Sequence, residues 1–118
     1  VWGLTVCYDL RFSYDYWSRA NDLDGYLVVA NWPRPRREHW QALLRARAVE
    51  NLAYVIGVNR VGTDGAGLNY AGDSAVISPN GEVLAQASER EALLLVDIDP
   101  QATAATRERF GFLADRRA

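Results

Sequence analysis

Cys7 is the strongest candidate nucleophile in the sequence, because it lies where an apolar run ends and a polar segment begins. The run over residues 1–7 predicts a buried strand, and a helical segment follows residues 8–11. A nucleophile at a turn from strand to helix projects from the edge of a sheet, and the next backbone N–H groups can stabilise an oxyanion. Arg11 nearby favours the thiolate. The alternative is that Cys7 is a small buried hydrophobic residue.

His39 is the only histidine and therefore the only imidazole that could activate the thiol. The alternative is a structural or capping role near the start of a predicted helix. One Cys and one His exclude a disulfide within the chain and make a Cys/His zinc site untenable, so we expect no metal and no cofactor. All 13 cationic side chains are Arg, so a catalytic Lys would have to come from outside these residues.

The composition limits the classes of partner. The 118 residues suffice for about one domain, and the net charge of -2 argues against nucleic acid as the main partner. The arginines at 34, 36 and 37 precede Glu38 and are interpreted as a solvated loop. No apolar run reaches the length of a membrane span. A lone Cys without a secretion signal predicts a cytoplasmic protein.

The elements that must position Cys7 alternate between strands and helices, which predicts an α/β fold. Hydrophobic patterning predicts strands over 1–7, 25–30 and 53–59, and helices over 13–20 and 36–51. A mixed sheet is expected, because a meander follows with strands over 74–78 and 83–87 around the turn Pro79-Asn80-Gly81. The remaining predictions are a glycine-rich loop over 62–72, a strand over 93–98, a helix from Pro100 to about Phe110 and a polar tail over 112–118.

Four stretches together resemble the carbon–nitrogen hydrolase (nitrilase) superfamily. The sequence GLTVCYDLRF at 3–12 resembles the nucleophile motif, and HWQALLRARAVEN at 39–51 is the second specific match. The other two are VANWP at 29–33 and GDS at 72–74 followed by SPNGE at 78–82. The Asn-Trp-Pro loop and NRVGTDG at 59–65 are most similar to the omega-amidase branch.

The resemblance implies an αββα sandwich of the nitrilase type and a Glu-Lys-Cys triad. Cys7 matches the family nucleophile, whereas the family's Glu and Lys lie upstream of this motif. Only six residues precede Cys7, and none of them is Glu. We therefore expect residues 1–118 to be the C-terminal part of a single hydrolase domain whose N-terminal part is absent, and we expect no activity from these residues alone.

The resemblance also suggests roles for four other residues. The Tyr8 backbone N–H would be an oxyanion donor, and Asn31 and Trp32 would line the pocket; packing of the loop is the equal alternative for this pair. Arg11 could bind a substrate carboxylate, or it could form a buried ion pair with Asp9 or Glu50. The side chains of His39, Trp40, Arg47 and Glu50 are interpreted as architecture.

The resemblance implies an amidohydrolase that cleaves the terminal amide of a small dicarboxylic acid monoamide, such as 2-oxoglutaramate, through a Cys thioester. Its partners would be the amide and water, without nucleic acid or membrane, and a homodimer is expected. One alternative is an N-carbamoyl amino acid or ureido-acid hydrolase of the same superfamily. The alternative from another class is a non-catalytic α/β binding or oligomerisation module in which Cys7 is only packed.

Overall fold

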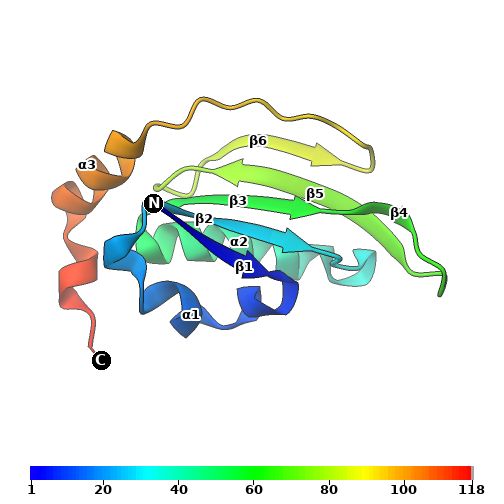
Figure 1. Cartoon of the computed structure of the whole chain (residues 1–118), viewed down its shortest axis with the longest axis horizontal. Coiled ribbons are helices and arrows are strands. Elements are labelled where there is room, and N and C mark those ends of the chain that lie inside the picture. The colour runs from blue at the N-terminus through cyan, green and yellow to red at the C-terminus, as the bar shows by residue number, and fades with distance from the viewer. Residues whose placement is uncertain (118) are drawn as a thin grey trace.

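The computed structural model describes residues 1–117 and has two layers, a sheet with helices packed on one of its faces (Figure 1). The six-stranded sheet has the order β1-β2-β3-β5-β4, and β6 pairs with β5. Its strands are β1 (Trp2–Val6), β2 (Gly25–Ala30), β3 (Tyr54–Asn59), β4 (Val61–Thr63), β5 (Asn69–Ile77) and β6 (Val83–Ser88). The helices are α1 (Ser13–Trp17), α2 (Arg37–Asn51) and α3 (Pro100–Phe110), with 3-10 helices at Cys7–Arg11, Ala20–Asp22, Arg34–Arg36 and Phe112–Asp115.

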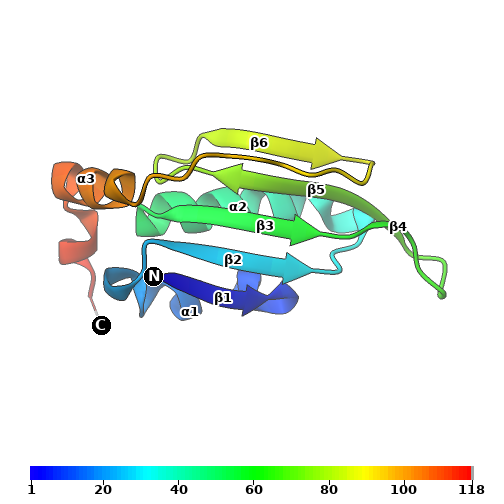
Figure 2. The ribbon, with the colours of Figure 1, turned by 45° about the horizontal axis from the view of Figure 1, so that its top comes forward.

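The first three strands are parallel, and their carboxyl ends meet at one edge of the sheet (Figure 2). Val6 lies opposite Val29, and Ala30 lies opposite Asn59. Strand β5 is antiparallel to β3, β4 and β6, so the sheet is mixed, as predicted. Chain segments that follow β1, β2 and β3 are therefore neighbours in space, although they are far apart in sequence.

Helix α2 covers the middle of the sheet, because its apolar side chains repeat at the three-four spacing. Trp40, Leu44 and Ala48 are buried. A Cβ on Gly57 of β3 would lie 2.7 Å from a Leu44 methyl group, so a side chain there would force Leu44 or Trp40 to shift. Buried Arg47 donates to the Leu10 carbonyl at 3.1 and 2.8 Å, which confirms its predicted architectural role.

Two predictions of local structure need correction. Residues 62–72 are not one loop, because β4 and the start of β5 form a hairpin there. Their polar, glycine-rich sequence hid the strands, and the turn is held by Asp64, whose Oδ1 accepts from the N–H groups of Ala66 and Leu68 at 2.9 Å each. Residues 93–98 are extended but have no ladder partner within residues 1–117, so they are not a strand.

Smaller differences concern the helices. Helix α1 ends at Trp17 instead of continuing to residue 20, whereas α3 begins at Pro100 as predicted, capped by the Asp99 side chain. The polar-tail prediction is wrong for Phe112–Asp115, a 3-10 helix with a buried Leu113. Residue 118 of that tail lies outside the described residues. The predicted hairpin forms around Ser78–Gly81, with positive φ on Gly81 but not on Asn80.

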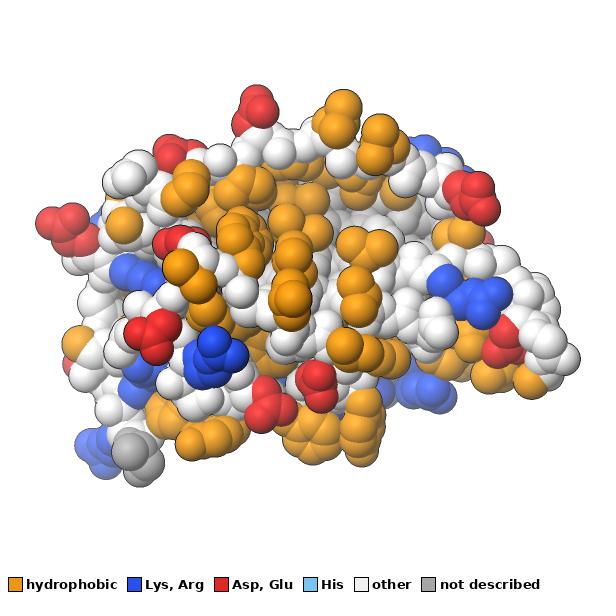
Figure 3. Space-filling model, in the orientation of Figure 1, with side chains coloured by type: hydrophobic (Ala, Val, Ile, Leu, Met, Phe, Trp, Pro, Cys, Tyr) orange, Lys and Arg blue, Asp and Glu red, His pale blue; other side chains and the backbone are white. Residues whose placement is uncertain are grey.

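The face of the sheet opposite α2 is bare and apolar. Leu4, Val29 and Val58 are 77%, 50% and 53% exposed, and Figure 3 shows a band of hydrophobic side chains across this face. The structure thus contains one helical and one sheet layer of the predicted sandwich, and it confirms a mixed sheet with flanking helices. No helix within residues 1–117 combines the length and apolar character needed to cross a membrane.

Candidate active site

Cys7 occupies a sharp turn between β1 and the 3-10 helix Cys7–Arg11, as its position in the sequence predicted. Its φ is +45°, a left-handed conformation that is uncommon for a residue with a side chain. The Val6 N–H donates to Asp9 Oδ2 at 2.9 Å, which braces this turn. Conformations of this kind persist only where the surroundings enforce them, and they concentrate at functional sites.

The Cys7 thiol faces the loop that follows β2. The side chain is half-buried, and Sγ lies 3.9 Å from the Asn31 carbonyl oxygen, to which it donates. The Asn31 side chain itself is exposed. The structure therefore brings together two residues that the sequence singled out, Cys7 and Asn31.

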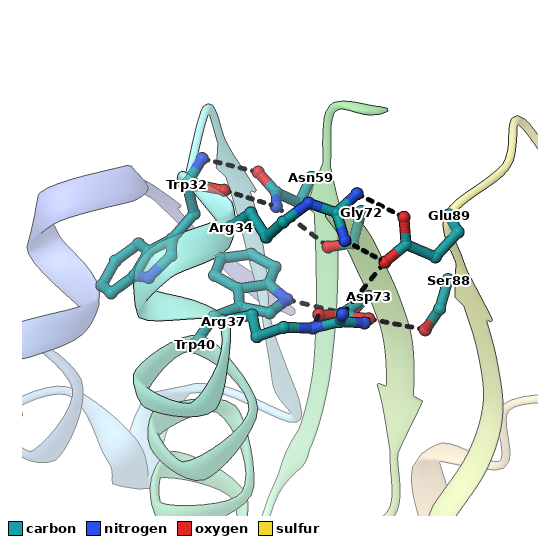
Figure 4. Close-up of polar contacts among 9 residues, drawn as sticks. All are labelled: Trp32, Arg34, Arg37, Trp40, Asn59, Gly72, Asp73, Ser88 and Glu89. Carbon is teal, nitrogen blue, oxygen red and sulfur yellow. Dashed lines mark hydrogen bonds and ion pairs between the residues drawn. The ribbon is translucent and has the colours of Figure 1, made fainter. Parts of the chain in front are cut away.

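The loop after β2 is held by Asn59, the last residue of β3 (Figure 4). Asn59 Oδ1 accepts from the Trp32 N–H at 2.7 Å, and its Nδ2 donates to the carbonyls of Trp32 at 3.1 Å and Gly72 at 2.9 Å. Sequence reasoning assigned no role to this residue. Its signal was a polar side chain at the end of an apolar strand, where a buried amide must find partners.

The Trp32 indole is part of the hydrophobic core. It is only 4% exposed, its Nε1 donates to the Arg36 carbonyl at 2.8 Å, and its ring lies 5.7 Å from that of Trp40. This environment matches the packing alternative for the indole. The backbone of Trp32, through Asn59, is what fixes the loop beside Cys7.

The Arg11 guanidinium lies over the Trp32 ring. Its Cζ lies 4.8 Å from the ring centroid, and its Nη2 lies 3.2 Å from His39 Nδ1. Neither Asp9 nor Glu50 pairs with it among the described residues, so neither predicted ion pair forms there. Within residues 1–117 the hydrogen-bond partner of His39 is Arg11 rather than Cys7.

A second cluster fixes the strand segment that Asn59 contacts (Figure 4). The buried Asp73 carboxylate accepts from Arg37 at 2.8 and 3.0 Å and from the Ser88 hydroxyl at 2.5 Å. The Trp40 Nε1 donates to the Asp73 carbonyl at 2.9 Å. Gly72 and Asp73 both have positive φ values, 76° and 57°, and form a bulge in β5 that side chains of α2 and β6 hold in place.

Glu89 ties the end of β6 to the same cluster. Its carboxylate accepts hydrogen bonds from both terminal nitrogens of Arg34. Arg37 Nη1 donates to the same carboxylate at 2.9 Å. The hydrogen bonds from Arg34, the charges of both arginines and the bond from Arg37 hold the pKa of Glu89 below its ordinary value. The loop after β2, helix α2 and the chain after β6 are thereby joined at the edge that carries Cys7.

The Tyr8 N–H belongs to the first turn of the 3-10 helix that Cys7 begins. The first N–H groups of a helix have no acceptor within it. The Tyr8 ring is 65% exposed and packs edge-on against Phe12 at 5.0 Å. Chemically, the site offers a thiol on a braced turn with backbone donors beside it, which is what attack on a carbonyl carbon requires. No cluster of three or more His, Cys, Asp or Glu side chains suited to a metal ion occurs in residues 1–117.

Comparisons with known proteins point in one direction. A family model described as carbon-nitrogen hydrolase matches residues 1–108. The chain is 55% identical over 107 residues to Omega-amidase YafV of Escherichia coli K12, which covers 89% of this chain and 41% of that protein. It is 39% identical over 121 residues to the 2-oxoglutaramate amidase of Paenarthrobacter nicotinovorans, covering 100% of this chain and 40% of that protein. The chain thus spans about two fifths of these relatives.

Solved structures agree with the sequence relatives. A carbon-nitrogen hydrolase superfamily protein from Xanthomonas campestris, which carries an arsenic adduct in its active site, matches with a TM-score of 0.94 and 44% identity. The match covers 99% of this chain and 47% of that one. An amidase from Nesterenkonia sp., to whose active site cysteine acrylamide has added, matches with a TM-score of 0.76 and 29% identity over 94% of this chain and 44% of that one.

Proposed function

The chain belongs to the carbon-nitrogen hydrolase family, and from that premise we propose that the intact protein is an omega-amidase. It would hydrolyse the terminal amide of a small dicarboxylic acid monoamide such as 2-oxoglutaramate and release ammonia. The similarity to an omega-amidase and to a 2-oxoglutaramate amidase supports this substrate class. The observation that carries the chemistry is the placement of Cys7, in a left-handed turn at the sheet edge with Sγ facing the Asn31 carbonyl.

In this proposal Cys7 is the nucleophile. Its Sγ forms a bond to the amide carbon, the C–N bond breaks, and the nitrogen leaves as ammonia after taking up the thiol proton through a general base. Water then cleaves the thioester, which releases the carboxylic acid and restores the thiol. The Tyr8 N–H would donate to the oxyanion, since it belongs to the first turn after the nucleophile.

The substrate would lie against the loop after β2. Exposed Asn31 is the proposed wall beside the thiol, and Trp32 contributes through its fixed backbone. Arg11, for which the sequence suggested carboxylate binding, has a guanidinium that already contacts Trp32 and His39.

We propose that a Glu and a Lys from outside these 118 residues complete the triad. The sequence contains no Lys, and the carboxylate nearest in sequence to Cys7, that of Asp9, accepts from the Val6 N–H instead. The bare apolar face of the sheet would pack against a second sheet that belongs to the same part of the protein. Residues 1–118 alone would then release no ammonia from any amide.

The test is the reaction of the intact protein with 2-oxoglutaramate, with ammonia release as the measurement. Cys7→Ala is expected to abolish turnover, and iodoacetamide is expected to label wild-type protein at Cys7 with a rate that rises with pH. Faster turnover of N-carbamoyl amino acids would favour the ureido-acid hydrolase alternative. Slow, unselective labelling together with no amide turnover would favour a non-catalytic module.

We also propose that the protein acts in the cytoplasm as a homodimer. The single cysteine supports a reducing compartment, since it leaves no disulfide to form within the chain. Sedimentation of the intact protein would test the dimer, and a single species with the mass of one chain would contradict it.

A further inference from the structure

We infer that Arg60 is the residue that binds the free carboxylate of the substrate, and that it selects monoamides of dicarboxylic acids over uncharged amides. This inference rests on the proposed amidase function and adds to it the group that recognises the far end of the substrate. Arg60 directly follows β3, so it lies at the edge where Cys7 follows β1 and Asn31 follows β2. Its N–H donates to the Ala30 carbonyl at 3.3 Å, which fixes it beside that loop.

The alternation of β3 places Arg60 on the bare face of the sheet. Gly57 faces α2, and exposed Val58 faces away from it, so the residue two positions beyond Val58 continues on the bare side. A cleft of about 360 Å³ opens there between the sheet and the extended chain after β6. Arg60, Val58 and Ser74 line the sheet side of the cleft, and Leu94 lines the other side.

The Arg60 guanidinium lies over a ring, and no carboxylate within residues 1–117 is close enough to pair with it, although Asp64 attracts it at longer range and Glu91 lines the same cleft. Its Cζ lies 4.7 Å from the Tyr70 ring centroid, and the Tyr70 hydroxyl in turn donates to Asp64 Oδ2 at 2.8 Å. Asp64 is already occupied by that hydroxyl and by two backbone N–H groups. No side chain within residues 1–117 forms an ion pair or hydrogen bond with the guanidinium, so its N–H groups are available to a ligand.

Tyr70 also links Arg60 to Cys7 electrostatically. The hydrogen bond to Asp64 is the main reason that the pKa of Tyr70 is raised, and negative charge on Cys7 adds to the same shift while Arg60 opposes it. The Tyr70 ring that supports Arg60 therefore lies near enough to Cys7 for their charges to interact. An arginine stacked on a ring keeps its edge available for a planar carboxylate, which it can bind through two parallel hydrogen bonds.

The length of the proposed substrate fits this placement. Two strand spacings, about 10 Å, separate the end of β1 from the end of β3. A five-carbon monoamide spans about 5 Å from its amide carbon to its carboxylate carbon, and the attacking sulfur approaches to about 3 Å. The long Arg60 side chain covers the remainder. By contrast, Arg11 is already shared between Trp32 and His39.

The experiment compares kcat and KM of the intact protein for 2-oxoglutaramate and for pentanamide, an uncharged amide of equal carbon count. Arg60→Gln is expected to lower kcat/KM for 2-oxoglutaramate by roughly 30-fold, mainly through KM, because a charge-assisted pair is lost. The preference over pentanamide should fall by a similar factor. The matched control is Arg109→Gln, since Arg109 also lies over a ring, Phe110 at 5.1 Å, but on α3. A retained preference in Arg60→Gln, or its loss only in Arg11→Gln, would overturn the inference.

A second measurement does not depend on turnover. Glutarate, the dicarboxylate of the same length, is expected to slow alkylation of Cys7 by iodoacetamide, and Arg60→Gln should raise the glutarate concentration needed about tenfold. If the wild-type protein hydrolyses 2-oxoglutaramate but glutarate protection is identical in Arg60→Gln, the Arg60 inference fails and the amidase proposal stands. If protection depends on Arg60 but no amide is hydrolysed, the amidase proposal fails instead.

Discussion

Asn59→Ala tests whether the loop beside Cys7 is positioned by a single amide. The substitution removes all three hydrogen bonds that the Asn59 side chain makes to Trp32 and Gly72. Both partners lie in buried segments: Trp32 is 4% exposed, and Asp73 next to Gly72 is 1% exposed. The Trp32 N–H and two carbonyl groups would be left without their present partners.

The expected loss follows from the cost of unsatisfied buried groups. Each one costs about 1–3 kcal/mol, and a water molecule that enters the vacated space would recover part of it, so we expect the free energy of unfolding to fall by about 3 kcal/mol. The loop that carries the Asn31 carbonyl would also shift. A displacement of about 1 Å at a catalytic site can cost about 100-fold in rate, so kcat should fall more than KM rises.

Urea unfolding and amide turnover of the intact protein measure the two effects. Asn80→Ala is the control, because Asn80 is exposed in the Ser78–Gly81 turn and should change stability by less than about 0.5 kcal/mol. Asn59→Asp keeps the acceptor for the Trp32 N–H but sets a negative charge against two carbonyl oxygens. It should be less stable than Asn59→Ala at neutral pH and recover as acid protonates it. If Asn59→Ala unfolds like the control and keeps full kcat, the positioning argument is wrong.

Three further outcomes follow from other parts of the fold. Gly57→Ala should lower the free energy of unfolding by about 1–3 kcal/mol in urea, because its Cβ would meet a Leu44 methyl group at 2.7 Å. Burial raises the pKa of Tyr26 to about 12 from 10.0, so the free energy of unfolding should fall as pH rises between these values. In an ultraviolet titration, Tyr26→Phe should remove one tyrosine that ionises only at high pH. Hydrogen bonds from Arg34 lower the pKa of Glu89 below 4.5. The ionised Glu89 therefore stabilises the fold above that pH, and this stabilisation is lost as acid protonates it. Glu89→Gln should make the free energy of unfolding less dependent on pH in the acid range.

Hydrophobic periodicity predicted the part of the fold that surrounds the site. The strands β1 to β3 and helix α2 are within one or two residues of the predicted bounds, because each buries a regular apolar face. The β4–β5 hairpin was missed since its strands are short, polar and rich in glycine, so that pairing and not burial defines them. The strand predicted at 93–98 is an almost continuous apolar run, yet Leu93 and Leu95 are 84% and 85% exposed and no strand pairs with it among the described residues.

The residues of the candidate site also fall into two groups, those that a local motif identifies and those that only long-range contacts bring together. A short motif was enough to single out Cys7 and the loop at Asn31, because a turn that follows a strand is local in sequence. The contacts of Asn59 and Asp73 could not be found in this way, since the partners of their side chains lie 13 to 36 positions away in the sequence. Asn59 bonds Trp32 at a separation of 27, and Asp73 bonds Arg37 at a separation of 36. Only the sheet register brings these side chains together.

The register also explains why the motif around Cys7 depends on distant residues. A left-handed Cys7 costs energy, and besides the local bond from the Val6 N–H to Asp9 the turn is supported by contacts with distant residues. The Asn31 carbonyl is one such contact, and its loop is held through Asn59 to the bulge of β5 at Gly72 and Asp73, which Arg37 fixes. A substitution in this chain of contacts should therefore lower the reactivity of Cys7 without touching it, and iodoacetamide labelling of Asn59→Ala at a urea concentration where the protein stays folded would detect that loss directly.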